Sequence, residues 1–283
     1  MTKNAAKDKR IIVNKIILSL STVSAMIGIF FLFWILFSLM INGISGLELK
    51  IFTNDGAPPG FPEGGLRHAI IGQLILTFGA TIVGVPIGIL AGTYLSEFGA
   101  NSKIAHFIRD ISDVMISAPS VVIGTFVYAV YVAHTGNFSG TAGIIALGIM
   151  MLPIVIRTTD DMLGLVPQSL REAAAALGAP KWKVVLQVVY RGAKVGILTG
   201  VLLSISRVAG EAAPLLFTSL NNNFFTTNLN EPMPSLTVTM FNYATSPYED
   251  WQKLGWAAAF LLAMFVLSLN ILGRMIIRKK GNK

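Results

Sequence analysis

The chain contains long runs of residues without a charged side chain, and these runs limit what it can fold into. Five runs lack Asp, Glu, Lys and Arg: Ile16 to Ile41, Ala69 to Ser96, Val114 to Ala133, Ser139 to Ile156 and Leu254 to Gly273. A sixth, Val195 to Leu220, has only Arg207 and Glu211 as charged residues. A bilayer core needs ~20 apolar residues of helix to cross it, because no water is present there to satisfy the backbone. The sequence therefore predicts an all-α membrane protein with six transmembrane helices.

Composition agrees with this class and sets the size of the domain. Only 13% of the 283 residues are charged, compared with about 25% in soluble domains. Six helices leave no room for a large soluble domain as well, so we expect one membrane domain. The first apolar run exceeds the ~7 to 15 residues of a signal-peptide core and should remain as an anchor. The absence of cysteine excludes disulfides, thiol catalysis and cysteine-ligated metals.

Lysine and arginine are distributed unequally along the chain. The N-terminus, residues 97–113, residues 157–194 and the C-terminal tail together contain 18 of the 22. Because positively charged loops stay on the cytoplasmic side, both termini are expected to be cytoplasmic. The basic tail, with Arg278, Lys279, Lys280 and Lys283, is expected to fix this topology at anionic lipid and not to bind nucleic acid.

The most basic of these segments, residues 157–194, contains a short helical pattern. Leu170, Ala174 and Leu177 follow at helical spacing, Gly178 is a typical helix end, and Pro180 suits the start of the next helix. The pattern predicts a helix, a turn and a second helix.

Two interpretations of this short helix remain open from the residues alone. The run Ala173 to Ala176 has so little side-chain bulk that another backbone can approach closely, and Arg171 and Glu172 add charge at one end. These features fit a docking site for another protein. They also fit an amphipathic helix that rests on the membrane surface.

The only charges inside a predicted span are Arg207 and Glu211. They are four residues apart, so they share one helix face. Each charge costs roughly 2.5 to 3.5 kcal/mol at membrane depth, so both should face protein or a water-filled path. Pro214 should kink or loosen the helix beside them. The pair is either part of an anion path or a structural ion pair between helices.

Other residues give weaker indications. Arg157, at the end of the fourth run, is either an anion contact at the inner mouth or an ordinary positive-inside anchor. Asp160 and Asp161 are expected to be solvated loop charges and not metal ligands. Small-residue series predict that the second and fifth helices lie in the interior of the bundle: Gly84, Gly88 and Gly92, and Gly196 and Gly200.

Glu172, Ala173 and Ala174, with Gly178 following, resemble the cytoplasmic EAA loop of ABC-importer permeases. The resemblance implies a coupling helix that sits in a groove of an ATPase subunit, with Arg171, Glu172, Ala173, Ala174 and Gly178 as its coupling residues. The family pattern ends in I-x-L-P, but residues 188–191 here read VVYR without the proline, which indicates a subgroup.

Four longer stretches resemble the membrane subunits of bacterial phosphate importers. They are LPIVIRTTDDML from Leu152, REAAAALGAPKWK from Arg171, RVAGEAAPLLFT from Arg207 and SPYEDWQKLGWAAAFLLA from Ser246. The resemblance implies a type I (MetI-like) permease bundle over residues 68–277 with a coupling loop at 160–194. Residues 1–15 would be a basic cytoplasmic N-terminus, 16–67 a first helix with its external loop, and 278–283 a basic tail.

What the resemblance implies for function is a transport subunit of the prokaryotic cytoplasmic membrane that moves phosphate by alternating access. The implied path residues are Arg207, Glu211 and Arg157. The implied partners are a second, related permease, two ATP-binding subunits and an extracytoplasmic phosphate-binding protein. The sequence has no phosphate loop, zinc motif or nucleophile elbow, so no cofactor is expected on this chain, and ATP would be hydrolysed by a partner. A permease for sulfate, phosphonate or molybdate, or a secondary transporter, remains the alternative.

Overall fold

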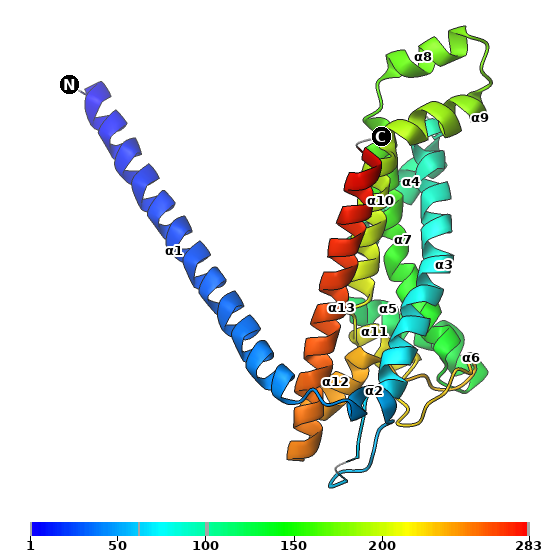
Figure 1. The fold of residues 1–283 in the computed structure, drawn as a ribbon. Helices are drawn as coiled ribbons and strands as arrows, with labels where there is room; N and C mark the ends of the chain where they lie inside the picture. The colour runs from blue at the N-terminus through cyan, green and yellow to red at the C-terminus, as the bar shows by residue number, and fades with distance from the viewer. Residues whose placement is uncertain (1, 62, 100–101, 282–283) are drawn as a thin grey trace.

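The computed structural model describes residues 2–61, 63–99 and 102–281, which form helices and connecting loops without a β-strand (Figure 1). The helices are α1 (Thr2–Ser45), α2 (Lys50–Thr53), α3 (Arg67–Glu97), α4 (Lys103–Ser117), α5 (Ser120–Val127), the π-helix η1 (Tyr128–Val132), α6 (Ala133–Thr135), α7 (Gly140–Gly164), α8 (Gln168–Ala176), α9 (Lys181–Val184), the π-helix η2 (Val185–Val189), α10 (Tyr190–Val208), α11 (Ala213–Thr218), α12 (Leu236–Ala244) and α13 (Glu249–Gly281).

Five helical segments of the described chain are long and apolar enough to cross a membrane. They are Arg10–Ser45, Arg67–Glu97, Gly140–Gly164, Lys181–Val208 and Glu249–Met275. A sixth crossing results if α4 and the segment from α5 to α6 are counted as one bent span. The prediction of an all-α protein with six spans is confirmed, as five single helices and one bent pair. In Figure 1, α8, α9 and the outer ends of α1 and α13 lie toward one end of the molecule, and α2 and α6 lie at the other.

Helix α7 is the centre of the bundle, because both α3 and α10 pack along it. In α7, 56% of the most apolar stretch is buried, compared with 28% in α3 and in the Lys181–Val208 span. The small residues of α3 permit this packing: a Cβ atom at Gly88 would lie 2.7 Å from the Val155 Cβ atom. We expected the second and fifth spans to be the interior helices. Their glycine faces do pack inside the bundle, but they pack against the fourth span, which is the most buried helix.

The third span is not the straight helix that the run from Val114 to Ala133 predicts. The chain bends by 109° between α4 and α5. Pro119 lies at the bend and disfavours helical geometry at Ala118, whose backbone is extended with ψ at 137°. Beyond the bend, α5 packs on α11, where a Cβ atom at Gly124 would lie 2.7 Å from the Pro214 Cα atom.

The fifth span also differs from its predicted position at Val195 to Leu220. The long helix covers Lys181–Val208 and ends before Gly210, and α11 begins separately at Ala213. Pro214 lies in the first turn of α11, where its missing N–H costs nothing. The expected loosening beside Arg207 and Glu211 is thus a complete break in the helix.

Helix α1 diverges from the bundle over most of its length (Figure 1). It contacts α13 near its C-terminal end, where Gly43 approaches Phe260 and Gly46 approaches the Lys253 carbonyl. None of its most apolar stretch is buried in this chain. A hydrophobic helix of this kind is covered by lipid or by another membrane subunit.

The contact between α3 and α7 can be tested with Gly92→Val. A Cβ atom at Gly92 would lie 2.6 Å from the Ile156 carbonyl oxygen and 2.6 Å from the Thr159 Cβ atom. We expect overpacking to cost about 1 to 3 kcal/mol and to lower the thermal unfolding temperature in detergent. Gly28→Val in α1 is the matched control, since nothing lies within 4 Å of that position. Equal stability of the two variants would contradict the packing described.

Candidate functional site

The two intramembrane charges lie at the break between α10 and α11, with Arg207 in the last turn of α10 and Glu211 between the two helices. Arg207 Nε lies 4.0 Å from Glu211 Oε1, and their side chains are 44% and 22% exposed. The Gly210 and Glu211 N–H groups donate to the carbonyls of Arg207 and Val208 in a tight turn. The structure thus brings the predicted pair together, but as a loose ion pair. Among the described residues, none accepts a hydrogen bond from the Arg207 guanidinium.

Buried polar side chains from other helices hold this turn. Gln73, near the N-terminal end of α3 and 2% exposed, donates from Nε2 to the Ala209 carbonyl at 3.1 Å. Thr237 Oγ1 donates to the Glu211 carbonyl at 3.1 Å, and the Thr237 N–H donates to Gln73 Oε1 at 3.4 Å. A helix that breaks at membrane depth leaves carbonyls without partners, and these groups satisfy them. Sequence reasoning missed both residues, although a glutamine inside an uncharged apolar run is a usable signal.

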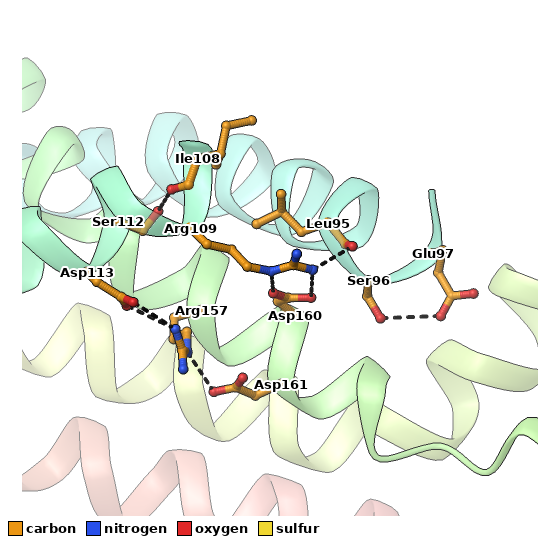
Figure 2. Close-up of polar contacts among 10 residues, drawn as sticks. All are labelled: Leu95, Ser96, Glu97, Ile108, Arg109, Ser112, Asp113, Arg157, Asp160 and Asp161. Carbon is orange, nitrogen blue, oxygen red and sulfur yellow. Dashed lines mark hydrogen bonds and ion pairs between the residues drawn. The ribbon is translucent and has the colours of Figure 1, made fainter. Parts of the chain in front are cut away.

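Arg157 lies near the opposite end of the bundle, close to where α7 meets the segment containing α8. Its Nη1 atom is 3.0 Å from Asp113 Oδ1 on α4, and its Nε atom is 3.1 Å from Asp161 Oδ2 (Figure 2). The Arg157 side chain is 45% exposed. In the described part of the chain, Arg157 and Arg207 have no ion-pair partner in common, so the two arginines belong to separate places along the bundle.

Asp160 is not a solvated loop charge, contrary to the expectation from sequence. It lies within α7 and forms a two-pronged ion pair with Arg109 of α4, with Nε 2.7 Å from Asp160 Oδ2 (Figure 2). Arg109 also donates to the Leu95 carbonyl of α3 at 2.8 Å. This group therefore joins α3, α4 and α7. Among the described residues no three His, Asp or Glu side chains lie together as a metal site.

Residues 165–180, which we call the α8 loop, project from this end of the bundle (Figure 1). Pro167 precedes α8, and Gly178 ends it with a φ of +80°, a conformation that favours glycine. No residue of α8 is buried. Leu170 is 49% exposed and Leu177 is 90% exposed, and Glu172 and Ala173 are also exposed. An apolar and acidic surface of this kind fits contact with another protein.

Arg171 is the exception in the α8 loop, because its side chain turns back into the molecule. It donates to both carboxylate oxygens of Glu97 at the end of α3, with Nη2 2.7 Å from Oε1, and to the carbonyls of Leu163 and Val166. The Arg171 and Glu97 side chains are 17% and 6% exposed. Both lie beside a cavity of about 640 Å³ between α8 and the bundle, which Glu172 and Lys181 also line. Sequence reasoning placed Arg171 among the groups offered to a partner, and the structure places it in an internal contact.

An all-helical bundle with a broken, charged span and an exposed helical loop between two spans defines a membrane transport subunit. Residues 84–282 match the family of binding-protein-dependent transport system inner membrane components, and this chain therefore belongs to that family. These are membrane components of transport systems and not enzymes.

Several proteins are similar to this chain over nearly its whole length. The chain is 50% identical over 267 residues to the phosphate transport system permease protein PstA of Haemophilus influenzae, covering 94% of each chain. It is 51% identical to PstA of Yersinia pestis, covering 94% of this chain and 90% of that one. A probable PstA of Methanocaldococcus jannaschii is 34% identical, with 94% of each chain covered.

Solved structures share the fold at low sequence identity. An inward-facing MetNI methionine ABC transporter matches with a TM-score of 0.59 at 19% identity, over 74% of this chain and 91% of that one. An amino acid ABC transporter matches with a TM-score of 0.57 at 19% identity, over 75% and 92%. The predicted type I, MetI-like bundle is confirmed by these matches.

Gln73→Leu tests whether this residue holds the break after α10. The substitution leaves the Ala209 carbonyl without its buried partner, which costs about 1 to 3 kcal/mol. We expect the backbone amides of residues 208–214 to exchange hydrogen faster in detergent, measured by mass spectrometry. Gln187→Leu is the control, because Gln187 is an exposed glutamine of the Lys181–Val208 span, which ends at this break. Unchanged exchange in the Gln73 variant would contradict this role.

Proposed function

We propose that this chain is the membrane-spanning permease subunit of an ATP-driven importer that moves inorganic phosphate across the cytoplasmic membrane of a prokaryote. The observation that most supports the proposal is whole-chain identity of about one half to phosphate transport permeases. The exposed α8 loop supports the ATP-driven mechanism, because a secondary transporter has no use for a surface that docks an ATPase.

Arg207 and Glu211 are the residues to which we assign the phosphate path. A guanidinium binds phosphate oxygens through charge-assisted hydrogen bonds, and the exposed fraction of Arg207 leaves its donors accessible. Glu211, 4.0 Å away, competes with the anion for the same positive charge. It therefore keeps phosphate from binding too tightly to leave. Arg157, already paired with two carboxylates, would contact the anion at the other mouth.

The partners follow from the surfaces of the chain. Two ATP-binding subunits (PstB-like) would hydrolyse ATP, one of them docking on Glu172, Ala173, Ala174 and Gly178 of the α8 loop. A second, related permease (PstC-like) would complete the translocation pathway, and the unpacked length of α1 gives it a surface to cover. An extracytoplasmic phosphate-binding protein (PstS-like) would deliver the anion at the opposite end. The mechanism is alternating access, in which ATPase closure opens the bundle toward the binding protein and hydrolysis resets it.

The experiment that tests this function is uptake of labelled phosphate at low concentration, with labelled sulfate in parallel. Cells lacking this gene and cells with the gene restored are compared after other phosphate carriers have been removed. We expect loss and rescue for phosphate only. Unchanged phosphate uptake, or an effect on sulfate, phosphonate or molybdate in its place, would contradict the substrate assignment.

Arg207→Gln tests the path residue itself. Loss of the positive charge should reduce phosphate uptake at least about tenfold, the equivalent of one charge-assisted hydrogen bond. Co-purification of the partner subunits should be unchanged. Arg207→Lys keeps the charge without the planar fork and should retain part of the activity. Full uptake by Arg207→Gln would remove Arg207 from the path.

A further inference from the structure

We infer that Glu97 and Gln73 make α3 the helix that connects the α8 loop to the turn containing Arg207 and Glu211. In this arrangement Glu97 receives the displacement of α8 through Arg171, and Gln73 passes it to the backbone beside the charged pair. The inference rests on the proposed function, because an ATPase must move α8.

The connection at the α8 end is a largely buried ion pair between helices distant in sequence. Glu97 and Arg171 are 74 residues apart, and their side chains are 6% and 17% exposed. Arg171 lies within α8 and also donates to the carbonyl of Leu163 in the last turn of α7 and to that of Val166 just beyond it. Removing one member of such a pair leaves an unpaired buried charge, so α8 cannot separate from α3 without a large cost.

Few other contacts restrain α8. None of its residues is buried, and the cavity of about 640 Å³ separates much of it from the bundle. In the described chain, the ion pair that α8 makes is the one with α3. Ala174 adds a partly buried apolar contact. Displacement of α8 by a partner therefore acts through Arg171 on α3, at Glu97, as well as on the end of α7, at the Leu163 carbonyl.

Helix α3 is long enough to join the two places. Glu97 and Gln73 are 24 residues apart in one helix of 31 residues, which corresponds to about 36 Å along its axis. The close contacts of Gly88 and Gly92 with α7 keep α3 from sliding independently. At the far end, Gln73 bonds the Ala209 carbonyl directly, two residues from Arg207.

The test measures coupling in the complete importer, reconstituted in proteoliposomes with labelled phosphate and ATP. Glu97→Ala should leave the subunits assembled and ATP hydrolysis active. We expect phosphate transported per ATP hydrolysed to fall about tenfold, within the range of measured coupling energies. Stimulation of hydrolysis by the binding protein should fall with it. Glu97→Gln still accepts one hydrogen bond from Arg171. Its ratio of phosphate transported to ATP hydrolysed should therefore lie between those of the wild type and Glu97→Ala.

Asp160→Ala is the matched control. Asp160 pairs with a partly buried arginine that also bonds a main-chain carbonyl, as Glu97 does, but the pair does not involve α8. Its loss should lower thermal stability without changing phosphate per ATP. An unchanged ratio in Glu97→Ala, or an equal fall in Asp160→Ala, overturns the inference. Failure of the wild-type complex to transport phosphate would instead overturn the proposed function.

Discussion

The close packing of α3 on α7 is the contact on which the rest of the bundle depends. Glycines on α3 bring the two backbones together, so that α7 is enclosed by α3 on one side and by α10 on another. In lipid, apolar surface gains little by leaving one apolar environment for another, and helices associate through close contact. Small residues at this interface therefore determine which helices become neighbours. They also place α3 between the α8 loop and the broken span.

Breaking a helix inside a membrane leaves polar backbone groups that water cannot satisfy. The chain supplies their partners from Gln73 on α3 and Thr237 on α12. With the carbonyls satisfied, the turn keeps Arg207 only loosely paired with Glu211. An irregular backbone that lines a path is thus compatible with a stable membrane domain. The same bonds tie the path residues to α3.

The sequence predicts the elements of this fold better than their connections. Uncharged runs reveal the spans because length and hydropathy are local properties, and the turn at Gly178 follows from local chemistry as well. The bend at Pro119 was missed, and the end of α10 at Val208 was expected only as a kink or loosening near Pro214, because hydropathy continues through both. The pair of Glu97 with Arg171 spans 74 residues, and no local pattern joins them. Arg207 and Glu211 were found because their spacing of four residues is a local signal.

The distance between α8 and α3 in the working importer tests most directly whether the two helices move together. The chain has no cysteine, so spin labels at Leu177→Cys and Leu90→Cys, both highly exposed positions, report this distance without background from this chain once any reactive cysteines of the partner subunits have been replaced. Pulsed electron resonance in proteoliposomes compares the nucleotide-free complex with the ATP-bound complex. We expect one unchanged distance distribution, because the α8 loop and α3 move as a unit. A distance that changes between the two states would show that the α8 loop moves independently of α3.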